Sequence, residues 1–101
     1  MLKTDPLPVD EEESIPLDIL KEAMATIIVR GKDYGDSDSN LQFIASLWTM
    51  YLGKTISCKD VALMMVLLKI ARSKYPKYLK DNYVDICGYA AIAADQDEQG
   101  K

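Results

Sequence analysis

The chain has 101 residues, a length that suits one domain with one hydrophobic core. Its hydrophobic fraction of 49% and charged fraction of 28% are those of a globular protein, and no apolar run approaches the roughly 20 residues that a membrane-spanning helix needs. The sequence contains no histidine, which excludes nucleophile–histidine pairs and histidine metal ligands. We therefore expect a cytoplasmic protein that does not enter a membrane.

Residues 1–14 carry the whole net charge of −4, because five acids face one lysine there while residues 15–101 hold equal numbers of each sign. This acidic segment also contains Pro6 and Pro8 and has little apolar surface, which predicts a disordered arm. A second interpretation is an arm that binds a partner. The neutral remainder argues against nucleic-acid binding, which requires a basic surface.

Apolar residues spaced three and four apart predict a first helix over about residues 16–30, ending at Gly31. The loop expected over residues 31–38 (GKDYGDSD) places Lys32 and Tyr34 close to Arg30. Glycines let backbone N–H groups approach an anion and the two basic residues supply charge, so a phosphate site is one interpretation. The other is a turn that ends the helix, in which the basic residues complement the helix C-terminus.

A second helix is predicted over about residues 39–52, with Gly53 as its stop. Trp48 and Tyr51 lie on its apolar face. Such aromatic residues usually belong to the core, and stacking on a nucleotide base is the alternative.

Ser57 and Asp60 have the spacing of a capping box and precede eight consecutive apolar residues, VALMMVLL. A buried strand also fits such a run. A helix is favoured because Ala, Leu and Met dominate and the pattern continues to Arg72, beyond the length of a strand. A helix that is apolar on all sides is expected at the centre of the bundle. Lys69 and Arg72 at its end either complement the helix C-terminus or hold an anion.

The last helix is predicted from about Lys80 or Asp81 to Asp95. Asp81 and Asp85 lie four residues apart on one face, so they either bind Mg²⁺ through oxygen or serve as a cap and an ion pair with the basic residues of the preceding helix. Gly88 lies inside this helix, where glycine costs about 0.5–1 kcal/mol relative to alanine. Its presence indicates the close approach of either a neighbouring helix or a ligand.

Together these patterns predict an all-α protein, a compact bundle of about four helices. The expected boundaries are a disordered arm over 1–14, a helical domain over 15–96 and a disordered tail over 97–101. Cys58 and Cys87 match no metal or redox spacing and are expected to be reduced, partly buried thiols. The abundance of apolar residues in such short helices predicts a homo-oligomer.

Three segments, taken in order, resemble a known group of proteins: KDYGDSDSNLQFIASLW, VALMMVLLKIAR and DNYVDICGYA. They are similar to an uncharacterised family of small phage and prophage proteins, and more distantly to the MazG-like all-α nucleoside triphosphate pyrophosphohydrolases. The resemblance covers about residues 17–94. It implies an oligomeric helical bundle in which carboxylates bind Mg²⁺ and basic residues hold nucleotide phosphates.

Under this resemblance Asp81 and Asp85 are expected to bind the metal, where the hydrolases place their second carboxylate pair. Lys69 and Arg72 stand where those enzymes grip phosphates. The Glu-x-x-Glu of an earlier hydrolase helix has no counterpart, because the first helix offers only Asp18 and Glu22 at a different spacing. Catalytic residues are therefore left unassigned.

The leading functional hypothesis is a phage-type protein that binds a nucleotide or a nucleotide-derived molecule, with Mg²⁺-dependent pyrophosphate hydrolysis as its enzymatic form. The alternative is a non-enzymatic phage inhibitor of a host defence protein, acting by protein–protein binding or by sequestering a signal nucleotide. The ligand-binding residues are expected to be Arg30, Lys32, Tyr34, Lys69, Arg72 and Tyr89. The acid pair Asp81 and Asp85 and the basic pair Lys69 and Arg72 are expected to face one pocket beside Gly88 and Tyr89, with Arg30 and Tyr34 at its mouth.

Overall fold

The computed structural model describes residues 14–34 and 37–101, with the side chains of residues 32–38 outside the description, and it contains four helices there. They are α1 (Ile15–Tyr34), α2 (Ser37–Leu52), α3 (Cys58–Ser73) and α4 (Lys80–Glu98). The described residues form no strand, so the predicted all-α bundle of four helices is confirmed. Nearly all of the acidic arm, residues 1–13, lies outside the described residues.

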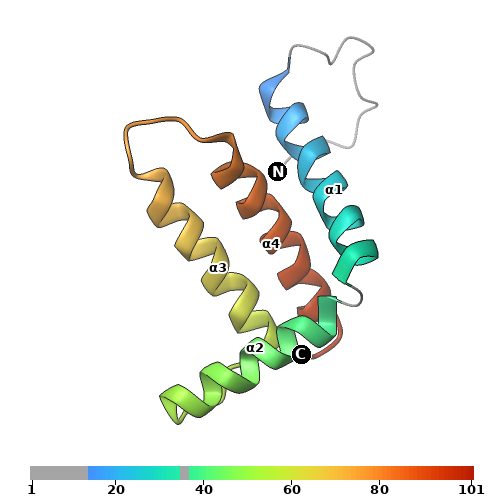
Figure 1. The fold of residues 1–101 in the computed structure, drawn as a ribbon, viewed down its shortest axis with the longest axis vertical. Coiled ribbons are helices and arrows are strands. Elements are labelled where there is room, and N and C mark those ends of the chain that lie inside the picture. Colours follow the sequence, from blue (N-terminus) through green and yellow to red (C-terminus); the bar gives the residue numbers. More distant parts are fainter. Residues whose placement is uncertain (1–13, 35–36) are drawn as a thin grey trace.

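The central helix is α4, which lies between α1 and α3, while α2 crosses one end of the bundle (Figure 1). The expectation that the third helix would be central is therefore wrong. Only one side of α3 is covered, where Val61 and Ala62 are fully buried, and Leu67 on the opposite side is 64% exposed. The all-round apolar character of α3 thus exceeds what one chain can bury.

The core consists of two clusters. One joins α2 to α3 through the buried residues Leu41, Ala45, Cys58 and Val61, with Trp48 packed against it. The other joins α1 to α4 through Ile19, Ala23 and Val84, with Cys87 packed against it. Trp48 is thus a core residue as expected, whereas Tyr51 is 89% exposed and is not. Cys58 and Cys87 are both free thiols.

Two glycines that were expected to end helices behave differently. Gly53 has a φ of 67° and its N–H donates to the carbonyl of Thr49 at 2.9 Å, so it ends α2 as predicted. Gly31 keeps a negative φ, and α1 continues past it to Tyr34. Glycine favours the end of a helix when it takes the left-handed conformation, which Gly31 does not. The expectation of a loop over residues 31–38 is therefore wrong for residues 31–34 and 37–38, which are helical.

The capping box predicted at the start of α3 is present. The Ser57 hydroxyl accepts a hydrogen bond from the N–H of Asp60 at 3.0 Å, and the Asp60 carboxylate accepts one from the N–H of Ser57 at 3.0 Å. Both donors would otherwise lack a partner at the helix end.

Replacing Ser57 by alanine is expected to lower the free energy of unfolding by about 1 kcal/mol, because it removes this cap. A scan of thermal unfolding should show the midpoint falling by about 4–8 °C for a domain of this size. Ser46→Ala, at an exposed position inside α2, is the control and should not lower the midpoint. Equal midpoints for wild type and Ser57→Ala would contradict a stabilising cap.

Both ends of α4 are tied to other helices. Its N-cap is Leu79, without a side-chain hydrogen bond, so Asp81 is not the cap that the sequence allowed. Its C-terminal end runs past the expected boundary at residue 96, and the chain then returns to α3, where the N–H of Lys59 donates to the carbonyl of Lys101 at 3.2 Å. Lys59 also pairs with Asp97 at 3.2 Å. Residues 97–101 are therefore exposed but connected to the start of α3 by a hydrogen bond and an ion pair.

Lys80 connects the start of α4 to α1, since its ammonium lies 2.8 Å from Asp18 and 2.7 Å from Glu22. The hydrogen bond from Lys80 lowers the pKa of Asp18, and the hydrogen bonds from Ser57 lower the pKa of Asp60. The same contacts with Asp18 and Glu22 raise the pKa of Lys80.

These two aspartates predict a loss of stability in acid. A carboxyl whose pKa is lower in the folded than in the unfolded chain stabilises the fold at pH values above its ordinary pKa of 3.8. That contribution disappears as the pH falls through the lowered pKa. The temperature of the unfolding midpoint should therefore decrease at pH values below about 4. Asp60→Asn keeps a hydrogen-bond acceptor but does not titrate, so it should make the midpoint depend less on pH. A midpoint that stays constant between pH 5 and pH 2 would contradict a stabilising role for the two carboxylates.

Candidate functional site

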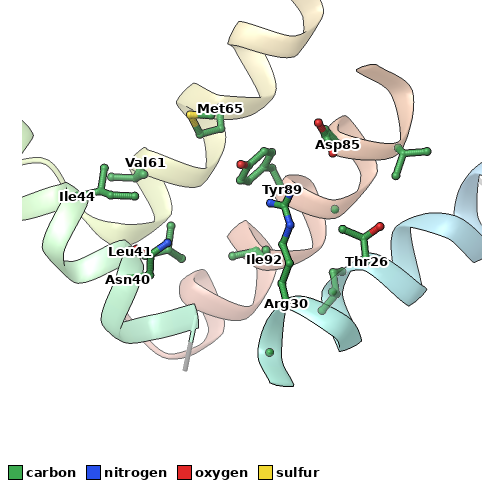
Figure 2. A pocket seen from close by; sticks show the side chains of 14 residues that line it. Thr26, Arg30, Asn40, Leu41, Ile44, Val61, Met65, Asp85, Tyr89 and Ile92 are labelled. Carbon is green, nitrogen blue, oxygen red and sulfur yellow. The ribbon is translucent and has the colours of Figure 1, made fainter. Parts of the chain in front are cut away.

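A cavity of about 700 Å³ lies between the four helices, and residues of both core clusters line it. Each helix contributes to its wall (Figure 2). The volume falls within the range of about 300–1,000 Å³ that is usual for small-molecule sites. Half of the described lining residues have apolar side chains without rings: Ile27, Leu41, Ile44, Val61, Met65, Val84 and Ile92.

Two glycines inside helices form part of this wall, Gly31 of α1 and Gly88 of α4. A methyl group added at either position would meet no other atom within 4 Å. Helix packing therefore does not explain Gly88, which was one of its two interpretations. The two glycines instead leave these parts of the cavity wall without side chains, so that the helix backbone itself borders the cavity.

The polar groups of the cavity come from three helices. Arg30 of α1 extends into the space between the helices towards Tyr89 of α4, and Asn40 of α2 lies on the facing wall (Figure 2). Thr26 also lines the cavity; its hydroxyl donates to the carbonyl of Glu22 at 2.9 Å, which leaves its oxygen able to accept. Few polar groups on an apolar wall are typical of a site that orients a bound molecule.

Asp85 also lines the cavity, and its carboxylate forms an ion pair with Lys69 of α3 at 2.8 Å. The two side chains are only 19% and 14% exposed. The pair therefore holds α3 to α4 in a poorly hydrated place, where each charge requires the other. The sequence allowed this pairing as one alternative to a metal site.

The remaining members of the expected acidic and basic pairs do not join them. Asp81 and Arg72 are exposed, and neither belongs to the described lining of the cavity. Among the described residues no group of three or more acids or cysteines could hold a metal ion. The structure thus brings Arg30, Asp85 and Tyr89 together at one cavity, and Lys69 joins them through its ion pair with Asp85. Asp81 and Arg72 lie outside the cavity.

Lys32 and Tyr34 belong to the last turn of α1, directly after Arg30 and Gly31. Their side chains lie outside the described residues, so the expectations that Tyr34 lies at the mouth of the pocket and that Lys32 binds the ligand remain predictions. Two polar residues of the cavity, Thr26 and Asn40, were missed by sequence reasoning. Thr26 lay within an apolar stripe and Asn40 near the start of a helix, and nothing in their local spacing distinguished them from surface residues.

No helix in the described part of the chain has the length and apolar character needed to cross a membrane.

Comparison with known proteins gives relatives from bacteriophages. The chain is 48% identical over 64 residues to the Gene 55 protein of Mycobacterium phage L5, an alignment that covers 62% of this chain and 41% of the phage protein. It is 47% identical over 73 residues to the Gene 55 protein of Mycobacterium phage D29, covering 71% of this chain and 48% of the relative. The chain therefore spans less than half the length of these relatives.

No solved structure matches the chain. A family model described as a domain of unknown function (DUF6378) matches residues 18–97, which include all of α2 and α3 and all but the first residues of α1 and the last residue of α4. The match and the phage relatives agree with the resemblance to an uncharacterised family of phage proteins. The chain belongs to the DUF6378 family.

Proposed function

We propose that this domain binds a nucleotide or a nucleotide-derived molecule in the cavity between its four helices. The observation that supports it best is Gly88, a glycine inside a helix that no packing contact requires and that borders a cavity of about 700 Å³. A helix retains such a residue at a cost in stability when a ligand must come close to its backbone.

The chemistry of the wall favours a nucleotide over a purely apolar ligand. The aliphatic side chains and Tyr89 offer a surface for a base, and the amide of Asn40 offers a donor and an acceptor for a base edge. Arg30 offers a guanidinium, whose paired donors match phosphate oxygens. We assign the phosphate to Arg30, with Lys32 as a second basic group. We assign no phosphate contact to Arg72, because it does not belong to the described lining of the cavity.

The described residues do not fit a Mg²⁺ site built by the protein. Asp85 is the one acid in the described lining, and Lys69 already neutralises it. Mg²⁺ commonly binds through one or two carboxylates together with substrate phosphates. We therefore include Mg²⁺ in the proposal only as an ion that a triphosphate carries with it, and we expect binding without it.

A panel of nucleosides, nucleoside triphosphates and cyclic nucleotides, each with Mg²⁺ and with EDTA, tests the proposal by thermal shift. A ligand present at a hundred times its dissociation constant should add about 2.7 kcal/mol of stability. Arg30→Ala should weaken triphosphates by about 10- to 100-fold, since a charge-assisted hydrogen bond contributes about 1.5–3 kcal/mol, and should affect nucleosides less. Lys54→Ala, an exposed basic residue after α2, is the matched control. No shift with any member of the panel would overturn the proposal.

Because the described lining of the cavity contains no acid besides the paired Asp85, a second candidate is favoured, in which a phage protein in the host cytoplasm sequesters a signal nucleotide of a host defence system without hydrolysing it. Hydrolysis by a MazG-like enzyme requires several carboxylates to hold the metal and activate water. Incubating the bound nucleotide with protein and Mg²⁺, followed by chromatography, separates the two. Intact nucleotide supports sequestration, whereas a monophosphate with pyrophosphate supports the hydrolase.

A further inference from the structure

The outer face of α3 is apolar along its whole length. Its large side chains are between 39% and 64% exposed, and no polar residue interrupts them. The exposed residues on this face, hereafter the α3 face, are Leu63, Met64, Leu67, Leu68, Ile70 and Ala71. A single chain leaves this strip in water, although apolar surface gains about 25 cal/mol for each Å² that is buried.

The two ends of the α3 face carry opposite charges. Asp60 lies at its N-terminal end and Lys74, the C-cap of α3, at its C-terminal end. They are fourteen residues apart in the sequence, a separation of about 21 Å along the helix, and fourteen steps of about 100° bring them to nearly the same side. Leu67 lies midway between them and is the most exposed large apolar residue of the face.

This distribution is self-complementary. If two α3 helices pack in opposite directions about a two-fold axis at Leu67, Asp60 of each copy lies opposite Lys74 of the other. Met64 then lies opposite Ile70, and Leu67 meets its own counterpart. A parallel arrangement would place like charges together at both ends. Charge complementarity therefore selects a second copy of this chain, in one orientation, as the occupant of the face.

We propose that two copies of this chain associate through their α3 faces, antiparallel, with Leu67 on the two-fold axis. The association leaves Val61 and Met65, the α3 residues that line the cavity, outside its centre, because they are turned by about 120–160° around the helix from Leu67. The association also covers the outer side of α3, which is apolar although α3 is not the central helix of the bundle.

Sedimentation velocity across the micromolar range tests the proposal. The wild-type chain should show twice the 11.3 kDa mass of one copy. Leu67→Glu should raise the dissociation constant on the order of a hundredfold, because two carboxylates would meet at the axis away from water. Met50→Glu is the matched control: Met50 is 78% exposed on α2, and its replacement should leave the dimer intact. A monomeric wild type, or a dimer that Met50→Glu but not Leu67→Glu dissociates, would overturn the proposal.

A crosslinking experiment covers the case in which Leu67→Glu fails to fold. A disulfide forms only when two Cα atoms are about 4.4–6.8 Å apart, a distance that facing residues on a two-fold axis can reach. Leu67→Cys treated with diamide should therefore give a covalent dimer much faster than Met50→Cys or the wild type. Equal rates for the two cysteine variants would mean that α3 does not face a second copy.

Discussion

Replacing Asp85 by asparagine is expected to lower the free energy of unfolding by about 2–3 kcal/mol. Breaking a fully buried ion pair from one side costs about 3–5 kcal/mol, and the partial exposure of this pair reduces the loss. Asparagine leaves the Lys69 ammonium charged between α3 and α4 without its carboxylate. The thermal midpoint should fall by roughly 10 °C or more, measured by circular dichroism at neutral pH.

The control for this result is the double variant Lys69→Met with Asp85→Leu. It removes both charges and places apolar groups of similar size between the helices, so it should be more stable than Asp85→Asn alone. Asp81→Asn, an exposed acid one turn earlier on α4, should leave the midpoint nearly unchanged. A double variant no more stable than Asp85→Asn would show that the two charges do not depend on one another.

Replacing Gly88 should change stability and ligand binding in opposite directions. Gly88→Ala should raise the free energy of unfolding by about 0.5–1 kcal/mol, because alanine favours the helix and its methyl group meets no atom within 4 Å. Gly88→Leu should keep the fold but place a side chain in the cavity, and we expect it to reduce nucleotide affinity more than tenfold. Thermal unfolding with and without the nucleotide measures both effects.

Gly53 provides the contrast, because its φ of 67° strains any residue that carries a Cβ atom. Gly53→Ala should therefore destabilise the fold by about 1 kcal/mol, although both glycines have open space around them. Unchanged nucleotide binding by Gly88→Leu would place the ligand elsewhere. A loss of stability in Gly88→Ala would indicate that the added methyl group meets a neighbouring atom, and therefore that this glycine is needed for packing.

The exposed acid and basic residues show how far a spacing rule reaches. Asp81 and Asp85 are one turn apart, as are Lys69 and Arg72, so the sequence offered two pairs that could meet. Position along the helix separates the members of each pair, because Arg72 lies in the last turn of α3 and Asp81 in the first turn of α4. Rotation does not explain the difference, since Arg72 is turned by only about 20° from the fully buried Val61. Lys69 and Asp85 fell inside, and Arg72 and Asp81 fell outside.

By itself, the sequence determined the features that depend on near neighbours along the chain: the four helices, the capping box at Ser57 and the stop at Gly53. These follow from side-chain periodicity and from hydrogen bonds within one turn. Only the tertiary structure decided which helix is central, that Lys69 rather than Arg72 pairs with Asp85, and that Gly31 and Gly88 border one cavity. Those outcomes depend on how each helix is rotated and placed against the others, and that placement is a balance of apolar burial over the whole bundle that no local pattern records.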